Sequence, residues 1–177
     1  MRLDFDDEQL DLAAAADAVL DRECAPAFVR AVFEGEASWQ PLYETMSALG
    51  WQALAVPESR GGLGLGFVEV GIVVEALGRH VAPGPYVTTA TQFLPALLGS
   101  GVAGTDDLVA GVLAGAVTGT LVDGGVSAER SGGTVRLTGT VAHVLGAGDV
   151  THLAVVAGSA TTLAVVPVDG DGVEIVA

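Results

Sequence analysis

The amino-acid periodicity of this chain changes near residue 115, and that change constrains its fold more than any other feature. Before it, apolar residues recur at helical spacing. After it, segments rich in β-branched residues are separated by glycine-containing turns. The order predicts an α+β protein. It has an N-terminal all-helical domain over residues 1–115, followed by an incomplete antiparallel β-domain over residues 116–177.

The helical part is expected to contain helices that start near residues 6, 38, 67, 88 and 105. Asp6 or Asp7 caps the first helix, which should stop before Pro26. In the second helix, Leu42, Met46 and Leu49 lie on one face. These patterns predict an amphipathic helical module.

The strand part contains the segments VTGTLV, TVRLTGTVAHV, HLAVVA and TTLAVVPV. The Asp-Gly-Gly sequence between Val122 and Val126 predicts a hairpin. The final VEIVA is also expected to be a strand. A sheet that stopped there would leave an open edge, so we expect either a longer chain or a partner that covers it.

The charge of the chain excludes two classes of partner. Its formal net charge is -15 at pH 7, whereas nucleic acids and anionic membranes require basic patches. The N-terminus has no hydrophobic signal region, and the apolar stretches are too short to span a membrane. Cys24 is the only cysteine and is expected in the core. A cytoplasmic location is therefore predicted.

The glycines at positions 61, 62, 64 and 66 form either a phosphate-cradling loop or a turn that precedes a helix. Their spacing does not fit G-x-G-x-x-G, and no lysine follows them as in a P-loop. The residues alone therefore indicate a structural turn between helices.

The surrounding segment, LGWQALAVPESRGGLGLGFVEVGIVVEALGR, resembles the N-terminal helical domain of the acyl-CoA dehydrogenases. That family has a G-x-x-x-L-x-V-P-E-x-x-G-G-x-G-L segment between two helices, and an E-x-L-(G/S)-R ending on the next helix. The matching positions are Gly50, Leu54, Val56, Pro57, Glu58, Gly61, Gly62, Gly64, Leu65, Glu75, Leu77, Gly78 and Arg79. Weaker resemblance extends over the first helix and through VRLTGTVAHVLGAGDVTHLAVVA, so it covers essentially the whole chain.

This resemblance implies an enzyme that oxidises the α,β bond of an acyl-CoA thioester. In the family, a glutamate removes the α proton and FAD accepts the β hydride. That glutamate normally lies in a C-terminal helical bundle that follows the β-domain. The resemblance therefore implies no catalytic residue in this chain.

The chain departs from the family pattern where the flavin is bound. The family's T-E-P-x-x-G-S-D loop is replaced by GTLVDGGVSAERSGG. The family's aromatic-Ile-Thr segment corresponds to residues 143–145, so the implied cofactor-binding positions are His143 and Leu145. Leucine has no hydroxyl to offer a flavin ring. His143 is either an aromatic substitute against the flavin or a strand histidine that faces water.

The other histidines are weaker candidates for chemistry. His80 is expected to cap a helix end, and His152 lies at a turn or strand edge without a visible partner. The three histidines and one cysteine have no metal-ligand spacing, so no metal site is predicted.

Some members of this family work as heteromeric pairs, in which one chain is degenerate. The missing flavin loop favours the interpretation that this chain is the degenerate member of such a pair. It implies a hetero-oligomer with a related acyl-CoA dehydrogenase subunit, FAD bound by or shared with the partner, and a bulky or steroid side-chain acyl-CoA substrate. The alternatives are a non-catalytic scaffold or acyl-CoA-binding module with the same fold, or an ordinary flavoenzyme aligned differently. We expect the chain alone to bind no FAD tightly.

Overall fold

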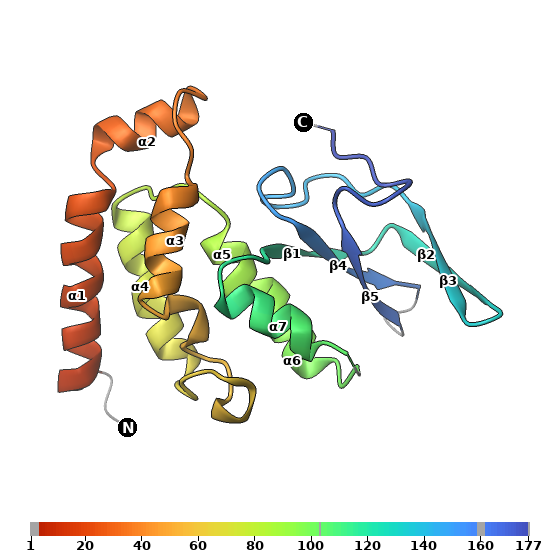
Figure 1. Cartoon of the computed structure of the whole chain (residues 1–177), viewed down its shortest axis with the longest axis horizontal. Coiled ribbons are helices and arrows are strands. Elements are labelled where there is room, and N and C mark those ends of the chain that lie inside the picture. Colours follow the sequence, from red (N-terminus) through yellow and green to blue (C-terminus); the bar gives the residue numbers. More distant parts are fainter. Residues whose placement is uncertain (1–3, 103, 159–161, 177) are drawn as a thin grey trace. The chain divides into compact units, whose positions relative to one another are not determined.

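The computed structural model describes residues 4–102, 104–158 and 162–176, and the chain divides into two compact units. The first unit comprises Met1–Gly84 with Leu113–Gly115, and the second comprises Pro85–Val112 with Ala116–Ala177. Figure 1 shows the helices and strands of both. Each unit is described by itself below.

The first unit is helical, as the sequence predicts. Its elements are α1 (Asp7–Glu23), α2 (Pro26–Phe33), α3 (Gln40–Ala48), the short 3₁₀ segments η1 (Trp51–Ala53) and η2 (Glu58–Arg60), and α4 (Phe67–Arg79). Asp6 caps α1: its carboxylate accepts from the Gln9 amide, and the Gln9 side chain accepts from the Asp6 amide in a capping box. The predicted start of the first helix is confirmed.

The core of this unit forms where α1 packs against α4 (Figure 1). Ala16 and Leu20 of α1 are buried, as are Val70, Val73 and Leu77 of α4. Contacts between Gln9 and Glu69 at the two N-terminal ends, and between Asp21 and His80 at the two C-terminal ends, show that α1 and α4 run in the same direction.

Two helix predictions need correction. The sequence predicts no helix between Pro26 and residue 38, but α2 begins at Pro26. Proline is tolerated in the first helical position because its missing N–H would have no intrahelical partner there. Leu49 was assigned to the buried face of α3, yet it lies at the C-cap and is 49% exposed.

The glycine-rich stretch after η2 is a turn, in agreement with the structural interpretation. The amides of Leu63, Gly64 and Leu65 donate to the carbonyls of Ala53, Val56 and Leu54, respectively. These amides are used inside the unit and do not face a phosphate. A Cβ atom on Gly62 would lie 2.0 Å from the Val56 carbonyl oxygen, so this close approach requires glycine.

The second unit combines helices with two small sheets. Its helices are α5 (Tyr86–Thr88), the π-helical segment η3 (Thr89–Phe93), α6 (Leu94–Gly99) and α7 (Asp106–Leu113), and its strands are β1 (Gly119–Asp123), β2 (Val126–Ser131), β3 (Thr134–Gly139), β4 (His152–Ala157) and β5 (Thr162–Pro167). One sheet has the order β1-β4-β5, and β2 pairs with β3 in the other. This is the α+β fold that the sequence predicts.

The pairing of β1 differs from the prediction. The expected hairpin through Gly124 and Gly125 is wrong, because β1 pairs with β4 in parallel while β2 pairs with β3. Most of β1 is buried although it is an edge strand, because it is covered by β4 on one side and η3 on the other, whereas β2 is largely exposed. The two glycines therefore lead the chain from one sheet to the other. The hairpin turn lies instead at Gly132–Gly133, between β2 and β3.

The third strand is shorter than TVRLTGTVAHV suggests. Its last residue, Gly139, pairs with Val126, which is the first residue of β2, and the preceding Gly125 has a left-handed backbone and lies outside the strand. The strand therefore ends at Gly139 for lack of a partner. The expected strand at VEIVA is also wrong, because residues 173–176 are irregular; Ala177 lies outside the described residues.

The core of the second unit lies between its two sheets. It is built from buried Val122, Val150, Leu153 and Val155, against which Val126 and Leu137 of the other sheet pack. The change from helix to strand falls between Leu113 and Gly119. The division into domains 1–115 and 116–177 stays a prediction.

Candidate functional site

The segment 140–150, between β3 and β4, holds both residues at the cofactor positions that the resemblance implies. Val141 and Val144 pack against the core between the two sheets. His143 and Leu145 are exposed, and 60% of the Leu145 surface is accessible. His143 and Leu145 therefore both lie on the surface of the second unit, on either side of the packed Val144.

His143 does not lie in a strand, which corrects the sequence reading. Its φ is +61°, in the left-handed region that histidine visits more readily than most side chains. The structure thus shows His143 exposed, as one alternative predicted, but on an irregular segment.

Hydrogen bonds fix the far end of this segment at the start of β4. The Thr118 amide donates to Thr151 Oγ1 at 2.9 Å, and the Thr151 amide donates to Thr118 Oγ1 at 3.0 Å. The Thr151 hydroxyl also donates to the Thr118 carbonyl. This reciprocal pair aligns β1 with β4 and gives the 140–150 segment a rigid anchor.

Side chains of η3 close the outer edge of β1, and the sequence reading missed them. Thr89 Oγ1 accepts from the Gly119 amide at 3.1 Å, and Gln92 Oε1 accepts from the Leu121 amide at 3.4 Å and from the Thr120 hydroxyl at 3.0 Å. These bonds satisfy backbone groups that an edge strand would otherwise expose. The only sequence signal for these contacts is the polar residues of η3, Thr89–Phe93, among otherwise apolar helical residues.

The residues of this segment do not make a flavin site by themselves. Leu145 has no polar side-chain atom, so it can offer a flavin ring only apolar contact. The edge amides of Gly119 and Leu121 are already occupied by Thr89 and Gln92, so they are not free to bind a cofactor. A flavin held here would need hydrogen-bond donors from elsewhere.

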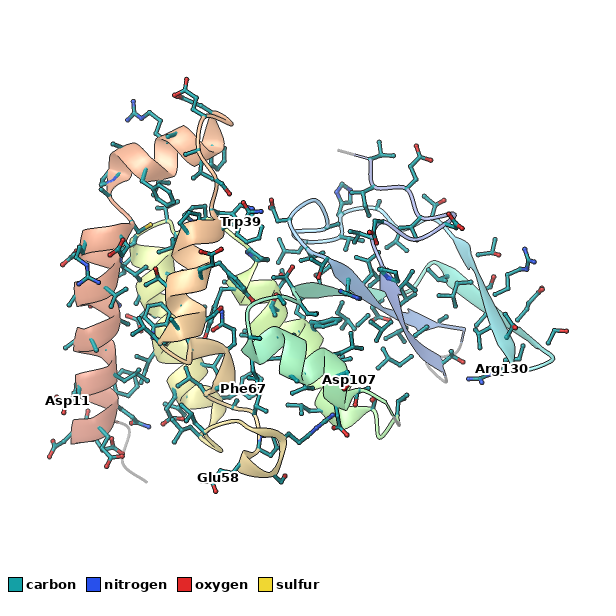
Figure 2. The ribbon with its side chains drawn as sticks, viewed as in Figure 1. Asp11, Trp39, Glu58, Phe67, Asp107 and Arg130 are labelled. Atoms are coloured by element: carbon teal, nitrogen blue, oxygen red, sulfur yellow. The ribbon has the colours of Figure 1, made fainter. Side chains whose placement is uncertain are left out.

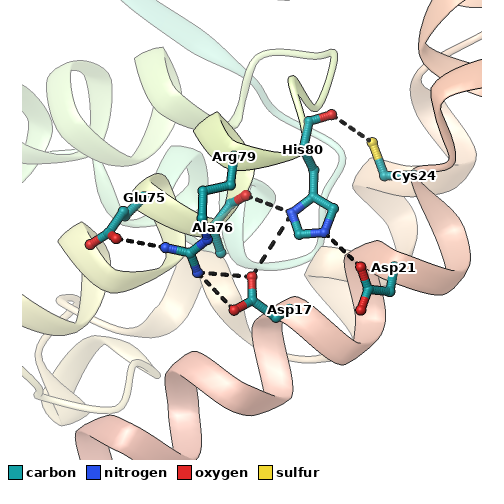
Figure 3. A network of polar contacts seen from close by, with 7 residues as sticks. All are labelled: Asp17, Asp21, Cys24, Glu75, Ala76, Arg79 and His80. Atoms are coloured by element: carbon teal, nitrogen blue, oxygen red, sulfur yellow. Dashed lines mark hydrogen bonds and ion pairs between the residues drawn. The ribbon is translucent and has the colours of Figure 1, made fainter.

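A second polar cluster joins α1 to the C-terminal end of α4, and Figure 3 shows it. Arg79 makes a two-pronged contact with both Asp17 oxygens at 2.8 Å and also contacts Glu75. His80 lies 2.9 Å from the Ala76 carbonyl through Nδ1 and 3.0 Å from Asp21 through Nε2. The Ala76 carbonyl and then Asp21 raise the pKa of His80 above its usual value. The predicted helix-end role of His80 is confirmed.

Cys24 belongs to the same cluster but has no exposed thiol. It is 2% exposed, and its Sγ lies 3.8 Å from the His80 carbonyl. Burial raises the pKa of the thiol, which disfavours the reactive thiolate. The prediction that Cys24 is a core residue is confirmed.

His152 does have partners, contrary to the sequence reading. Its Nδ1 lies 2.9 Å from Thr151 Oγ1, and its ring lies 6.4 Å from that of Phe93. Burial lowers its pKa. In the part of the chain that the structure describes, no group of three or more His, Cys, Asp or Glu side chains can hold a metal ion, and no helix is long and apolar enough to cross a membrane.

Comparison with protein families matches residues 6–120 to the N-terminal domain of acyl-CoA dehydrogenases. Among characterised sequences, the chain is 33% identical to acyl-CoA dehydrogenase FadE34 of Mycobacterium tuberculosis over 136 residues, which is 76% of this chain and 17% of that protein. It is 30% identical to FadE27 of the same organism over 145 residues, covering 38% of that protein.

Solved structures share the fold over nearly the whole chain. The ChsE4–ChsE5 complex from Mycobacterium tuberculosis matches with a TM-score of 0.88 and 26% identity, covering 100% of this chain and 51% of the matched chain. A variant of the steroid ACAD Tcur3481–Tcur3483 matches with a TM-score of 0.79 and 28% identity, covering 93% and 49%. The chain thus spans about half the length of these solved relatives.

Proposed function

The chain belongs to the acyl-CoA dehydrogenase family, and we propose that it is part of one subunit of a heteromeric, FAD-dependent member that oxidises the α,β bond of a bulky acyl-CoA. The proposed substrate class is an acyl-CoA with a steroid side chain. The proposed partner is a related acyl-CoA dehydrogenase subunit.

The likeness to the ChsE4–ChsE5 complex supports this proposal most strongly, because it extends over the whole of this chain at a TM-score of 0.88. The likeness to the steroid ACAD Tcur3481–Tcur3483 supports the same substrate class. At 26% and 28% identity, the likeness extends to the sequences as well as to the fold.

The exposed 140–150 segment supports the proposal that a partner supplies most of the flavin site. His143 and Leu145 face outward and can cover one side of a bound ring, but Leu145 cannot hydrogen-bond it. The partner or a further region would then provide the polar contacts to the flavin and the base that removes the α proton.

The flavin-to-chain ratio tests this function. The chain is purified alone and together with any acyl-CoA dehydrogenase subunit that co-purifies with it from its native source, and bound flavin is measured by visible absorbance. We expect essentially no flavin on the chain alone and about one flavin per two chains in the complex, which should reduce its flavin on addition of a steroid side-chain acyl-CoA. Stoichiometric flavin on the chain alone contradicts the proposal.

A non-catalytic scaffold or acyl-CoA-binding module is the second candidate, and the leucine at position 145 favours it. In that case, the complex or the chain alone binds acyl-CoA without flavin and without oxidising it. Calorimetric titration with the acyl-CoA, run beside the absorbance measurement, separates the two functions. The cytoplasmic location expected from the sequence stays a prediction.

A further inference from the structure

An apolar groove opens on the first unit. It has a volume of about 380 Å³ and lies between α1, the segment 49–54, the glycine-rich turn and the start of α4. Leu49, Leu63 and Leu65 line it and are 49%, 50% and 46% exposed, above the buried Trp51 and Leu54. Three half-exposed leucines around one hollow are typical of a surface that another molecule covers.

The rim of the groove is acidic. Asp6, Glu8 and Glu69 line it, and among the described residues of the lining there is no lysine, arginine or histidine. Asp6 and Glu69 are held in place because they accept from the amides of Gln9 and Gly66. The negative charges are therefore fixed around an apolar floor.

This charge pattern discriminates between possible occupants. The phosphates of coenzyme A are repelled by the rim, so the groove does not suit an acyl-CoA. A second copy of this chain is also disfavoured, because two molecules that each carry a net charge of -15 repel one another. An apolar segment flanked by lysine or arginine complements both the floor and the rim.

We infer that this groove is the docking site for an apolar, basic-flanked segment of the related acyl-CoA dehydrogenase subunit. The inference rests on the proposed heteromeric function and adds the surface that holds the two subunits together. Leu63 provides apolar contact from the side of the groove, and Glu8 provides charge at the rim.

The dissociation constant of the complex tests this surface, with the acyl-CoA dehydrogenase subunit that co-purifies from the native source as the probe. Leu63→Glu and Glu8→Lys should each weaken the complex about tenfold or more. Phe33→Glu is the matched control for the first change, since Phe33 is 88% exposed and does not line the groove. Asp11→Lys is the control for the second, because Asp11 lies on the outer side of α1 (Figure 2). Circular dichroism checks the fold of each variant.

A photo-crosslinking p-benzoylphenylalanine in place of Leu63, used in the complex, identifies the occupant. Crosslinks to a partner peptide that contains lysine or arginine support the inference. Unchanged affinity in Leu63→Glu and Glu8→Lys overturns the docking site and leaves the heteromeric function intact. Crosslinks to a second copy or to this chain's own polypeptide overturn the proposed occupant. If the unmodified chain forms no complex, the heteromeric function fails together with the inference.

Discussion

Gln9 of α1 donates a hydrogen bond from Nε2 to Oε1 of Glu69 on α4, at 2.7 Å. The same Gln9 completes the cap of α1, and Glu69 accepts from the Gly66 amide at the start of α4. One side-chain pair therefore joins the N-terminal caps of two parallel helices. The Gln9 amide lowers the pKa of Glu69 and so favours its ionised form.

Gln9→Ala removes both the capping-box bond and the bond to Glu69. We expect the free energy of unfolding to fall by about 1–2 kcal/mol, because the side-chain half of the capping box and a hydrogen bond to a charged group are lost together, while Asp6 still accepts from the backbone amide of residue 9. Urea unfolding followed by circular dichroism measures the change. Asp11→Ala, on the exposed side of α1, should change stability by less than about 0.5 kcal/mol. If Gln9→Ala and Asp11→Ala lower the free energy of unfolding equally, the Gln9–Glu69 pair does not contribute to stability.

The raised pKa of His80 predicts that the first unit loses stability as the pH rises. Its pKa is raised in the folded chain, mainly by the Ala76 carbonyl and then by Asp21. The stability that it adds is complete below its unfolded value of 6.5 and is lost as the pH rises through the folded pKa. Unfolding of the wild type and of His80→Gln between about pH 5 and 8 should show this loss only in the wild type. A wild-type curve parallel to that of the variant rules the effect out.

The lowered pKa of His152 predicts the opposite pH dependence of stability in the second unit. Burial lowers its pKa, so the stability that it adds is present above its unfolded value of 6.5 and is lost as the pH falls. His152→Gln should remove this acid-side loss and leave the alkaline side unchanged. The measurement is the same pH series of urea unfolding. The prediction is contradicted if, below pH 6.5, the free energy of unfolding of the wild type falls no more steeply than that of His152→Gln.

Glycine at position 62 is required by packing, and glycine at position 71 is not. Gly62→Ala places a Cβ atom 2.0 Å from the Val56 carbonyl oxygen, so we expect a loss of about 2–3 kcal/mol in the free energy of unfolding. Gly71 lies in the middle of α4 and is exposed to solvent, and a Cβ atom there would have no neighbour within 4 Å. Gly71→Ala should stabilise the chain by about 0.5–1 kcal/mol, as measured by urea unfolding. A neutral Gly62→Ala would mean that the turn relaxes freely.

Local signals in the sequence predicted most of the helices and strands, α2 excepted, because caps such as Asp6 and turn glycines act over a few residues. They failed where distant residues decide the outcome. The Asp-Gly-Gly turn after β1 allows a hairpin, yet Thr118 bonds to Thr151, 33 residues away, and aligns β1 with β4. The bond between Gln9 and Glu69 spans 60 residues and could not be read from spacing.

The candidate site was predictable in part for the same reason. The family resemblance pointed to positions 143 and 145, and the apolar Val141 and Val144 between and beside them hold the segment on the core. The left-handed backbone of His143 and the closure of the β1 edge by Thr89 and Gln92 depend on tertiary contacts. No local pattern specifies them.

Exposed residues of the 140–150 segment should affect flavin binding without affecting stability. In the complex with the partner subunit, His143→Ala and Leu145→Ala should each weaken FAD binding about threefold to tenfold, because each removes a side chain that would cover the ring. Both side chains are exposed in this chain, so the free energy of unfolding of the isolated chain should change by less than about 0.5 kcal/mol. FAD release is followed by fluorescence during dilution of the complex. Arg130→Ala, on the β2–β3 hairpin, is the control (Figure 2). Unchanged FAD binding in both variants would show that these two positions do not face the flavin.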